Sequence, residues 1–202
     1  MMKYRKCANG FRLKLLEPEM LERPLKMLLV GDGTVGKTSL CMFFTNKSFP
    51  TKHVPTIMEV AFTSMKINGV THRLSIWDTA GQEDFDRLRI LAYPNTDVFL
   101  VCYAIDNNES FNHVSSKWIP ELNKHCPGVP IILVGTKVDK RNQNEKKGVF
   151  VSNIRGRNLA KSDVGIVHFE ECSALNGINV LEILKTATEA ALGLHKKSCI
   201  IL

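Results

Sequence analysis

Apolar residues follow two alternating patterns along the chain, which predict strands and helices. Continuous apolar runs, typical of buried strands, cover residues 25–30, 98–105 and 130–134, and residues 167–171 are predicted to form the last strand. Residues 60–67 and 72–77 flank Asn68-Gly69, a strong two-residue hairpin signal. We therefore expect these last two segments to pair antiparallel.

Apolar residues at helical spacing fill the gaps between these strands. The groups that share one helix face are Leu40, Phe43 and Phe44; Phe111, Val114, Trp118 and Leu122; and Val180, Ile183, Leu184, Ala187 and Ala191. Strands that alternate with helices predict an α/β fold: a doubly wound, mostly parallel six-stranded sheet with one antiparallel edge strand. Ligands of such sheets bind beyond the carboxyl ends of the strands.

Length and composition suit one globular domain. The chain has 202 residues, of which 44% are hydrophobic and 23% charged. No apolar run reaches the roughly 18 residues of a membrane span, and the N-terminus lacks the apolar core of a secretory signal. We expect a domain at 25–193, an N-terminal extension at 1–24 that forms a mobile tail, and a C-terminal tail at 194–202.

The net charge of +7 is concentrated in two segments. Residues 1–24 carry six Lys/Arg against three Glu, residues 140–161 carry seven against Glu145 alone, and the rest of the chain is close to neutral. A nucleic-acid-binding protein is more uniformly basic, so we expect no nucleic acid partner. The basic segments fit an anionic surface or partner, or else solvated lysine-rich loops.

Residues 31–38 (GDGTVGKT) fit the phosphate-binding pattern G-x-x-x-x-G-K-[ST], between a predicted strand and a predicted helix. Glycines allow a tight turn that brings backbone N–H groups to phosphate oxygens, and the helix N-terminus adds a positive end. Lys37 would reach the β- and γ-phosphates, and the Thr38 hydroxyl would bind Mg²⁺. The alternative is an ordinary glycine turn. The predicted nucleotide-binding residues of this loop are Gly31, Gly33, Thr34, Val35, Gly36, Lys37, Thr38 and Ser39.

The segment after the strand at 72–77 contains three candidate residues for binding and hydrolysing a phosphate, and they are Asp78, Gly81 and Gln82. Asp78 occupies the strand end where P-loop proteins place an acidic partner of magnesium, bound directly or through water. Gly81 has no Cβ to keep its N–H from the terminal phosphate. Gln82 both donates and accepts hydrogen bonds, so it can orient an attacking water.

Residues 136–139 (TKVD) end the next apolar strand and predict base recognition. The Asp139 carboxylate can accept two parallel hydrogen bonds from guanine, which adenine cannot donate. Lys137 can lay its alkyl stem along the base plane, and the loop at Ser173-Ala174 can offer a backbone N–H to the guanine O6.

These motifs, in this order and spacing, resemble the Ras-like small GTPases, and within them the Rho/Rac family, from about Leu25 to Leu192. The Rho-like stretches are residues 31–33, 77–94 (WDTAGQEDFDRLRILAYP), 97–103 and 131–139 (IILVGTKVD). Thr136 is a Rho-like choice at a position where most small GTPases have Asn.

The resemblance implies GTP, GDP and Mg²⁺ as ligands, and two loops that the γ-phosphate orders: switch I at about 49–61 and switch II from 78 to about 93. It assigns Thr56 as second magnesium ligand and γ-phosphate sensor, and Phe49 as a residue that packs near the base. Gln82, Lys37 and Gly81 would be the catalytic residues of a slow GTPase.

The resemblance also implies partners. We expect a monomer that binds guanine-nucleotide exchange factors, GTPase-activating proteins, a GDP-dissociation inhibitor and, through the switches, actin-linked effectors. No arginine is placed to act in cis, so we expect an arginine finger from an activating protein, worth about 10³–10⁵ in rate.

Some positions depart from the Rho pattern. His53 stands where the family usually has a tyrosine, and Met58, Val60 and Ala61 replace residues that commonly include aromatics. Effector identity therefore does not carry over. The segment at 140–148 is shorter than the helical insert of Rho proteins, so we expect a turn or basic loop there.

The six cysteines are Cys7, Cys41, Cys102, Cys126, Cys172 and Cys199. They form no Cys-x-x-Cys pair, so five are predicted to be reduced and cytosolic. Cys199 begins the ending Cys-Ile-Ile-Leu, which predicts geranylgeranylation and attachment to the cytoplasmic face of a membrane. A single lipid anchors weakly, and Lys196 and Lys197 add only a thin basic patch. The basic extension is a candidate second signal.

Two other functions remain open. A P-loop ATPase or small-molecule kinase would share the phosphate loop, but Asp139 disfavours it. A module that holds GTP without cycling is expected to have lost Gly33 or Gln82, and this chain has both.

Overall fold

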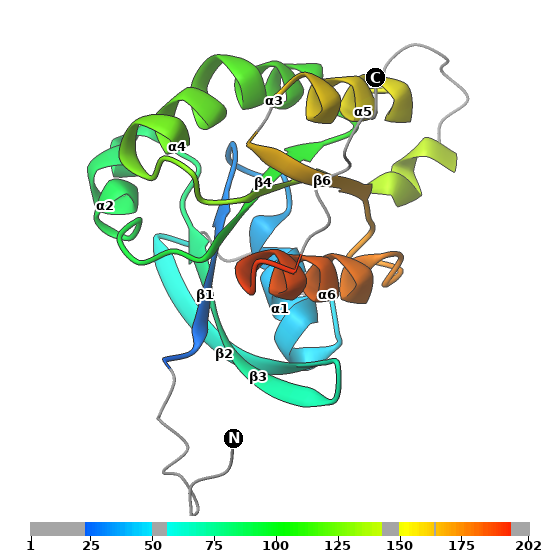
Figure 1. Ribbon diagram of the computed structural model, residues 1–202. Coiled ribbons are helices and arrows are strands. Elements are labelled where there is room, and N and C mark those ends of the chain that lie inside the picture. Colours follow the sequence, from blue (N-terminus) through cyan, green and yellow to red (C-terminus); the bar gives the residue numbers. More distant parts are fainter. Residues whose placement is uncertain (1–22, 50–55, 143–149, 164, 195–202) are drawn as a thin grey trace, which may run out of the picture.

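Six strands form one sheet in the order β2-β3-β1-β4-β5-β6 in the computed structural model (Figure 1). The structure describes residues 23–49, 56–142, 150–163 and 165–194. The strands are β1 (Leu25–Val30), β2 (Met58–Ile67), β3 (Val70–Thr79), β4 (Val98–Ala104), β5 (Ile131–Thr136) and β6 (Ile166–Glu171). Edge strand β2 pairs antiparallel with β3, and the other neighbours pair in parallel. The predicted fold class is confirmed.

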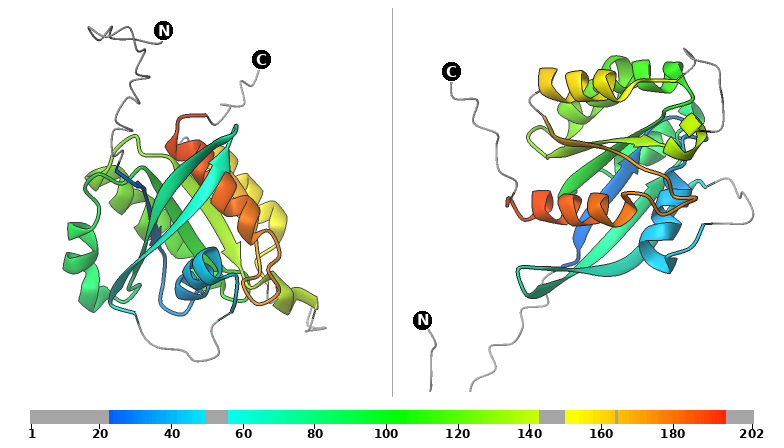
Figure 2. Two further views of the ribbon diagram at one scale, coloured as in Figure 1. Left: turned by 90° about the horizontal axis from the view of Figure 1, so that it is seen from below. Right: turned by 90° about the vertical axis from the view of Figure 1, so that its right-hand side faces the viewer.

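Helices cover both faces of this sheet (Figures 1 and 2). On one face lie α1 (Lys37–Asn46) and α6 (Val180–Ala191). The other face carries α3 (Asn108–His113), a π-helical turn η2 (Val114–Trp118), α4 (Ile119–His125) and α5 (Asn153–Ser162). The short elements η1 (Glu83–Phe85), α2 (Asp86–Leu91) and η3 (Val138–Asn142) lie in connections after strand ends.

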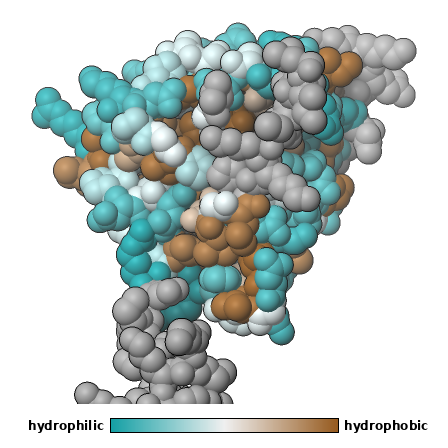
Figure 3. Space-filling model, viewed as in Figure 1, coloured by the Kyte–Doolittle hydropathy of each residue, from teal (hydrophilic) through white to brown (hydrophobic). Residues whose placement is uncertain are grey.

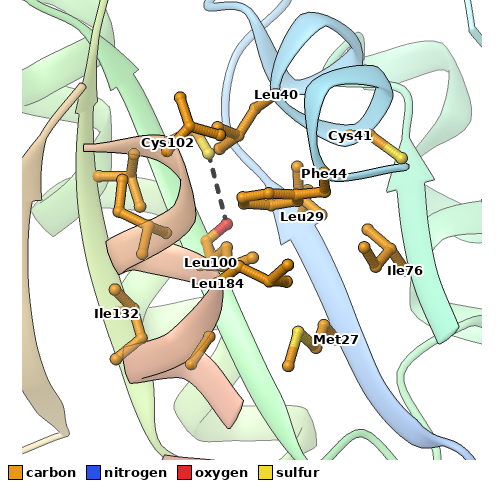
Figure 4. Close-up of a cluster of buried hydrophobic side chains, with 14 of the residues drawn as sticks. Met27, Leu29, Leu40, Cys41, Phe44, Ile76, Leu100, Cys102, Ile132 and Leu184 are labelled. Atoms are coloured by element: carbon orange, nitrogen blue, oxygen red, sulfur yellow. Dashed lines mark hydrogen bonds between the residues drawn. The ribbon is translucent and has the colours of Figure 1, made fainter. Parts of the chain in front are cut away.

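The two faces of the sheet give two apolar cores. Leu29 and Leu100 of the sheet pack with Phe44 of α1 and Leu184 of α6 in the first core, and Figure 4 shows these side chains together. The second core includes the predicted helix face at Phe111, Val114, Trp118 and Leu122, all buried. This pattern was therefore correctly predicted, although a π-helical turn interrupts the α-helix in its middle.

Strand β3 is longer than the sequence pattern predicts, and this moves Asp78. We expected Asp78 to follow the strand, but it lies inside β3 because it pairs with Glu59 of β2 on one side and Leu29 of β1 on the other. The Asn68-Gly69 hairpin is confirmed, with both residues at positive φ (49° and 86°).

Four cysteines lie in the described residues, and all four are free thiols: Cys41, Cys102, Cys126 and Cys172. Burial raises the pKa of Cys41 and Cys102 to about 12, so neither forms a reactive thiolate near neutral pH. Cys7 and Cys199 lie outside the described residues, as do His53 and most of the 140–148 segment. The expected turn or loop at 140–148 therefore stays a prediction.

The surface of the described part is mixed in character. In the view of Figure 1, hydrophilic side chains surround a group of apolar ones that lies below the centre (Figure 3). Large exposed hydrophobic residues occur on several elements, such as Phe62, Leu91 and Leu181. No helix among the described residues combines the length and the apolar character needed to cross a membrane.

Candidate functional site

The phosphate-binding loop connects β1 to α1, as predicted. At Gly31 (φ 139°), a Cβ would lie 2.1 Å from the Cys102 carbonyl oxygen, so a side chain does not fit. Gly36 (φ 99°) begins the turn into α1, and Thr34 also has a positive φ of 61°. A left-handed threonine stores backbone strain, a feature that clusters at functional sites.

A cavity of about 780 Å³ opens at the carboxyl ends of the strands beside this loop. It brings together most of the predicted site residues: Gly33, Thr34, Gly36, Lys37, Thr38, Ser39, Phe49, Thr56, Gly81, Gln82, Thr136, Lys137, Asp139 and Ala174. Four others do not line it: Gly31, Val35, Asp78 and Ser173. Val35 is buried, and its carbonyl accepts a hydrogen bond from the Thr136 hydroxyl (2.5 Å), which ties the loop to β5.

Lys37 is a buried cation inside the loop, with 6% of its surface exposed. Its Nζ donates to the Gly31 and Asp32 carbonyl oxygens, both at 2.7 Å. Burial lowers the pKa of Lys37, and the nearby Asp78 and Asp32 carboxylates offset part of this effect. An anionic ligand would stabilise the charged form further.

A magnesium ion fits the hydroxyl groups beside Lys37. The Thr38 and Thr56 side-chain oxygens lie 3.0 Å apart, and adjacent ligands of octahedral Mg²⁺ at 2.0–2.1 Å would be about 2.9 Å apart. Both carboxylate oxygens of the 1% exposed Asp78 lack a hydrogen-bond partner among the described residues. Burial raises the pKa of Asp78, with Thr38, Lys37 and Thr56 acting in the opposite direction. A water bound to the metal would therefore donate the hydrogen bonds that the buried Asp78 carboxylate lacks.

The described residues contain no group of three or more His, Cys, Asp or Glu side chains placed to hold a metal. Two hydroxyls and one carboxylate leave most coordination positions to waters and a bound phosphate. Magnesium is typically held in this way.

Gly81 lies directly against the phosphate-binding loop. A Cβ on Gly81 would lie 2.3 Å from the Gly31 carbonyl oxygen and from the Asp32 carbonyl carbon, so only glycine fits. Gln82 follows it and is exposed, and a Cβ on Gly33 would be 3.9 Å from the Gln82 Cγ. The glutamine side chain is therefore at the phosphate end of the cavity.

The other end of the cavity contains Asp139. The Ser173 hydroxyl donates to the Asp139 carboxylate at 2.5 Å, and the Ser173 N–H donates to the Ile178 carbonyl oxygen at 3.1 Å. Since the Ser173 N–H is used in this way, Ala174 is the member of the predicted pair whose N–H remains for a base. Ser173 instead orients the Asp139 carboxylate. The two residues are 34 positions apart in the sequence, so the sequence alone did not predict this contact.

Asp106 is a second residue that sequence reasoning missed. It follows β4 and pairs with Lys140 (2.5 Å) and Lys137 (3.7 Å). Burial alone would raise the pKa of Asp106, but these two lysines hold it below its usual range. Burial lowers the pKa of Lys137, which Asp106 partly offsets. Asp106 therefore positions the lysine predicted to lie along the base.

Switch I is described only in part. Residues 50–55 lie outside the described residues, whereas Met58 and the positions that follow belong to β2. The predicted loop at 49–61 is therefore too long at its C-terminal end, because β3 continues to pair with β2 as far as Met58.

A family comparison agrees with this geometry. The model of the Ras family matches residues 26–193, which is most of the chain and runs from the second residue of β1 to beyond the end of α6. Proteins of this family are small GTPases that bind GTP, GDP and Mg²⁺. This chain belongs to the Ras family of small GTPases.

Proposed function

We propose that this Ras-family protein is a Rho-type switch, which hydrolyses GTP slowly and signals to actin-linked effectors from the cytoplasmic face of a membrane. The observation that carries the nucleotide assignment is the base end of the cavity, where Ser173 holds Asp139 at a wall shared with Thr136 and Lys137. The Rho assignment is supported by residues 77–94 and by Thr136.

The site residues take the following roles in this proposal. The loop N–H groups and Lys37 bind the phosphates, and Asp139 selects guanine. Thr38, Thr56 and, through water, Asp78 hold Mg²⁺, which neutralises charge on the phosphates when bound. Gln82 orients the attacking water, and the Gly81 N–H faces the terminal phosphate.

Slow hydrolysis is expected when no arginine side chain reaches the phosphates. None of the described residues that line the cavity is an arginine. Arg89 of α2 is buried and bound to Glu121 at 3.0 Å, so it is not available to the phosphates. We therefore expect an activating protein to supply an arginine and to accelerate hydrolysis by about 10³–10⁵-fold.

The experiment that tests the switch uses single-turnover hydrolysis of GTP, with and without the catalytic domain of a Rho-type or a Ras-type activating protein. Acceleration by the Rho-type domain alone supports the proposal. Acceleration by the Ras-type domain alone contradicts the Rho assignment, and absence of phosphate release under all conditions favours the module that holds GTP without cycling. Competition between GTP and ATP for the same site distinguishes the ATPase alternative, which requires equal or better binding of ATP.

Membrane attachment forms the last part of the proposal. Cys199 and the lysines at 196 and 197 lie outside the described residues, so this part depends on sequence alone. Incubation with a geranylgeranyl donor and transferase should modify the wild type but not Cys199→Ser. Removal of residues 1–20 from the lipidated protein should weaken binding to anionic vesicles if the basic extension is the second signal.

A further inference from the structure

Asp32 is an acidic residue within a loop that binds anions, and its carboxylate is held by one helix. His113 Nδ1 lies 2.6 Å from Asp32 Oδ2, and the Trp118 indole N–H donates to Asp32 Oδ1 at 2.8 Å. Both carboxylate oxygens are therefore engaged by side chains of the α3–η2 segment. Neither His113 nor Trp118 belongs to the motifs that identify the nucleotide site.

The π-helical turn makes this two-point contact possible. His113 and Trp118 are five positions apart, and the N–H of Ile119 donates to the Val114 carbonyl, the i→i+5 bond of a π-turn. In a regular α-helix of 3.6 residues per turn, side chains five apart point in different directions. The wider π-turn brings them to the same carboxylate, and such turns occur often at functional sites.

The main chain of Asp32 contacts two of the proposed catalytic groups, Lys37 and Gly81. Its carbonyl oxygen accepts a hydrogen bond from Lys37 Nζ at 2.7 Å. Gly81 packs on the same peptide group, because a Cβ there would lie 2.3 Å from the Asp32 carbonyl carbon. A change in the placement of Asp32 would therefore move both Lys37 and Gly81.

We propose that His113 and Trp118 are positioning residues for GTP hydrolysis. They keep the Asp32 carboxylate away from the phosphates and fix the peptide that Lys37 and Gly81 contact. This inference rests on the proposed roles of Lys37 and Gly81. A carboxylate free to turn into the phosphate end would repel the triphosphate, since like charges destabilise each other at short range.

Other cations near this contact already have partners, so they do not take the place of His113. Lys117 pairs with Glu83 of η1, and Arg89 of α2 pairs with Glu121.

Among the described contacts, Asp32 is the acidic group bonded to the imidazole itself. Loss of the imidazole should therefore act mainly on Asp32.

The test measures single-turnover GTP hydrolysis and GDP dissociation. The variants are His113→Ala, His113→Asn and Trp118→Phe, of which the last keeps an aromatic ring and removes the N–H. His72→Asn on β3, which pairs with Met65 near the hairpin, is the matched control.

We expect His113→Ala to hydrolyse GTP about tenfold more slowly than the wild type, and Trp118→Phe to be several-fold slower. His113→Asn should be slowed less than His113→Ala, because an amide N–H can still donate to the Asp32 carboxylate. GDP dissociation should change by less than about threefold, and His72→Asn should follow the wild type.

Hydrolysis rates for His113→Ala, Trp118→Phe and the wild type that agree within twofold would overturn the positioning role and leave the proposed function intact. Absence of GTP hydrolysis by the wild type would overturn both. A parallel loss of GDP binding and thermal stability in all three variants would show that the contacts merely support the fold, and would also overturn the proposal.

Discussion

The two ends of the nucleotide cavity are built in different ways. At the phosphate end, eight consecutive residues supply backbone groups, and glycines are required at Gly31 and Gly81 because neighbouring carbonyl groups occupy the space of a side chain. At the base end, Asp139 depends on Ser173, and Lys137 depends on Asp106. One end is therefore made mainly of backbone groups of a single loop, whereas the side chains at the other end depend on partners from distant positions.

The charged groups at the two ends also differ in their partners. Both oxygens of the buried Asp78 at the phosphate end lack a hydrogen-bond partner among the described residues. At the base end, Asp139 is bonded to Ser173 and Asp106 Oδ2 to Lys140, while Asp106 Oδ1 lies 3.7 Å from Lys137 Nζ. The phosphate end thus depends on its ligand and metal to satisfy its charges. The base end is organised before a ligand binds, which suits selection between nucleotides.

The largest effect should come from the base end. Asp139→Ala removes the only acceptor proposed for the guanine edge, so the affinity for GDP should fall by about 10³-fold and the preference over ADP should disappear. Dissociation and association of a fluorescent GDP analogue measure this, with Glu182→Ala on the exposed side of α6 as the control. A variant that still prefers GDP over ADP would contradict the division of roles between the two ends.

A smaller effect, on rate and not on selection, is expected at the phosphate end. Gly81→Ala places a methyl group 2.3 Å from loop backbone, so the start of switch II must shift. A displacement of about 1 Å can reduce a rate by about 10²-fold. Single-turnover hydrolysis should fall by about that factor while GDP dissociation stays within a few-fold. An equal loss of GDP binding would show that Gly81 supports the loop as a whole.

Asp78→Asn should have opposite effects with and without the metal. Burial raises the pKa of Asp78, so its charge destabilises the unliganded fold increasingly as the pH rises above about 4, the ordinary value for Asp. In EDTA without nucleotide at pH 7, we expect the variant to be more stable than the wild type by about 1–3 kcal/mol. With GDP, its Mg²⁺ affinity should be about 10–100-fold weaker.

Thermal unfolding in both buffers measures this reversal, and repetition near pH 4 should shrink the advantage of the variant in EDTA. Destabilisation in both buffers would mean that a partner of Asp78 within the protein, and not the metal, satisfies the carboxylate.

Sequence reasoning predicted the phosphate end better than the base end, for a physical reason. The loop at 31–38 and the hairpin at Asn68-Gly69 are local, since a few consecutive residues determine their backbone angles. Continuous apolar runs likewise identified the buried strands β1, β4 and β5, and the hairpin signal identified β2 and β3. The helix face at Phe111, Val114, Trp118 and Leu122 was found from its apolar spacing.

What the sequence did not predict depends on contacts across the fold. The extension of β3 through Asp78 requires β1 and β2 on either side, and the π-turn at 114–118 has no local signature in the apolar spacing. The links from Ser173 to Asp139 and from Asp106 to two lysines join residues about 30 positions or more apart. Such pairs become visible only when the strands are placed side by side.

The smallest effect tests one of those links. Ser173→Ala removes one hydroxyl donor from the Asp139 carboxylate and leaves the proposed base contacts in place. A hydrogen bond to a charged group contributes about 1.5–3 kcal/mol, part of which water can replace, so GDP should dissociate about tenfold faster. Ser162→Ala on α5, which removes a hydroxyl bonded only to the Leu159 carbonyl among the described contacts, is the matched control.

The double variant Ser173→Ala with Asp139→Ala shows whether the serine acts through the carboxylate. If it does, the double variant should dissociate GDP no faster than Asp139→Ala alone, since no acceptor remains for the hydroxyl. Additive effects would mean that Ser173 instead supports the loop through Asn176, whose N–H donates to the same hydroxyl oxygen at 3.1 Å. In that case the base end would owe its order to local loop structure, as the phosphate end does.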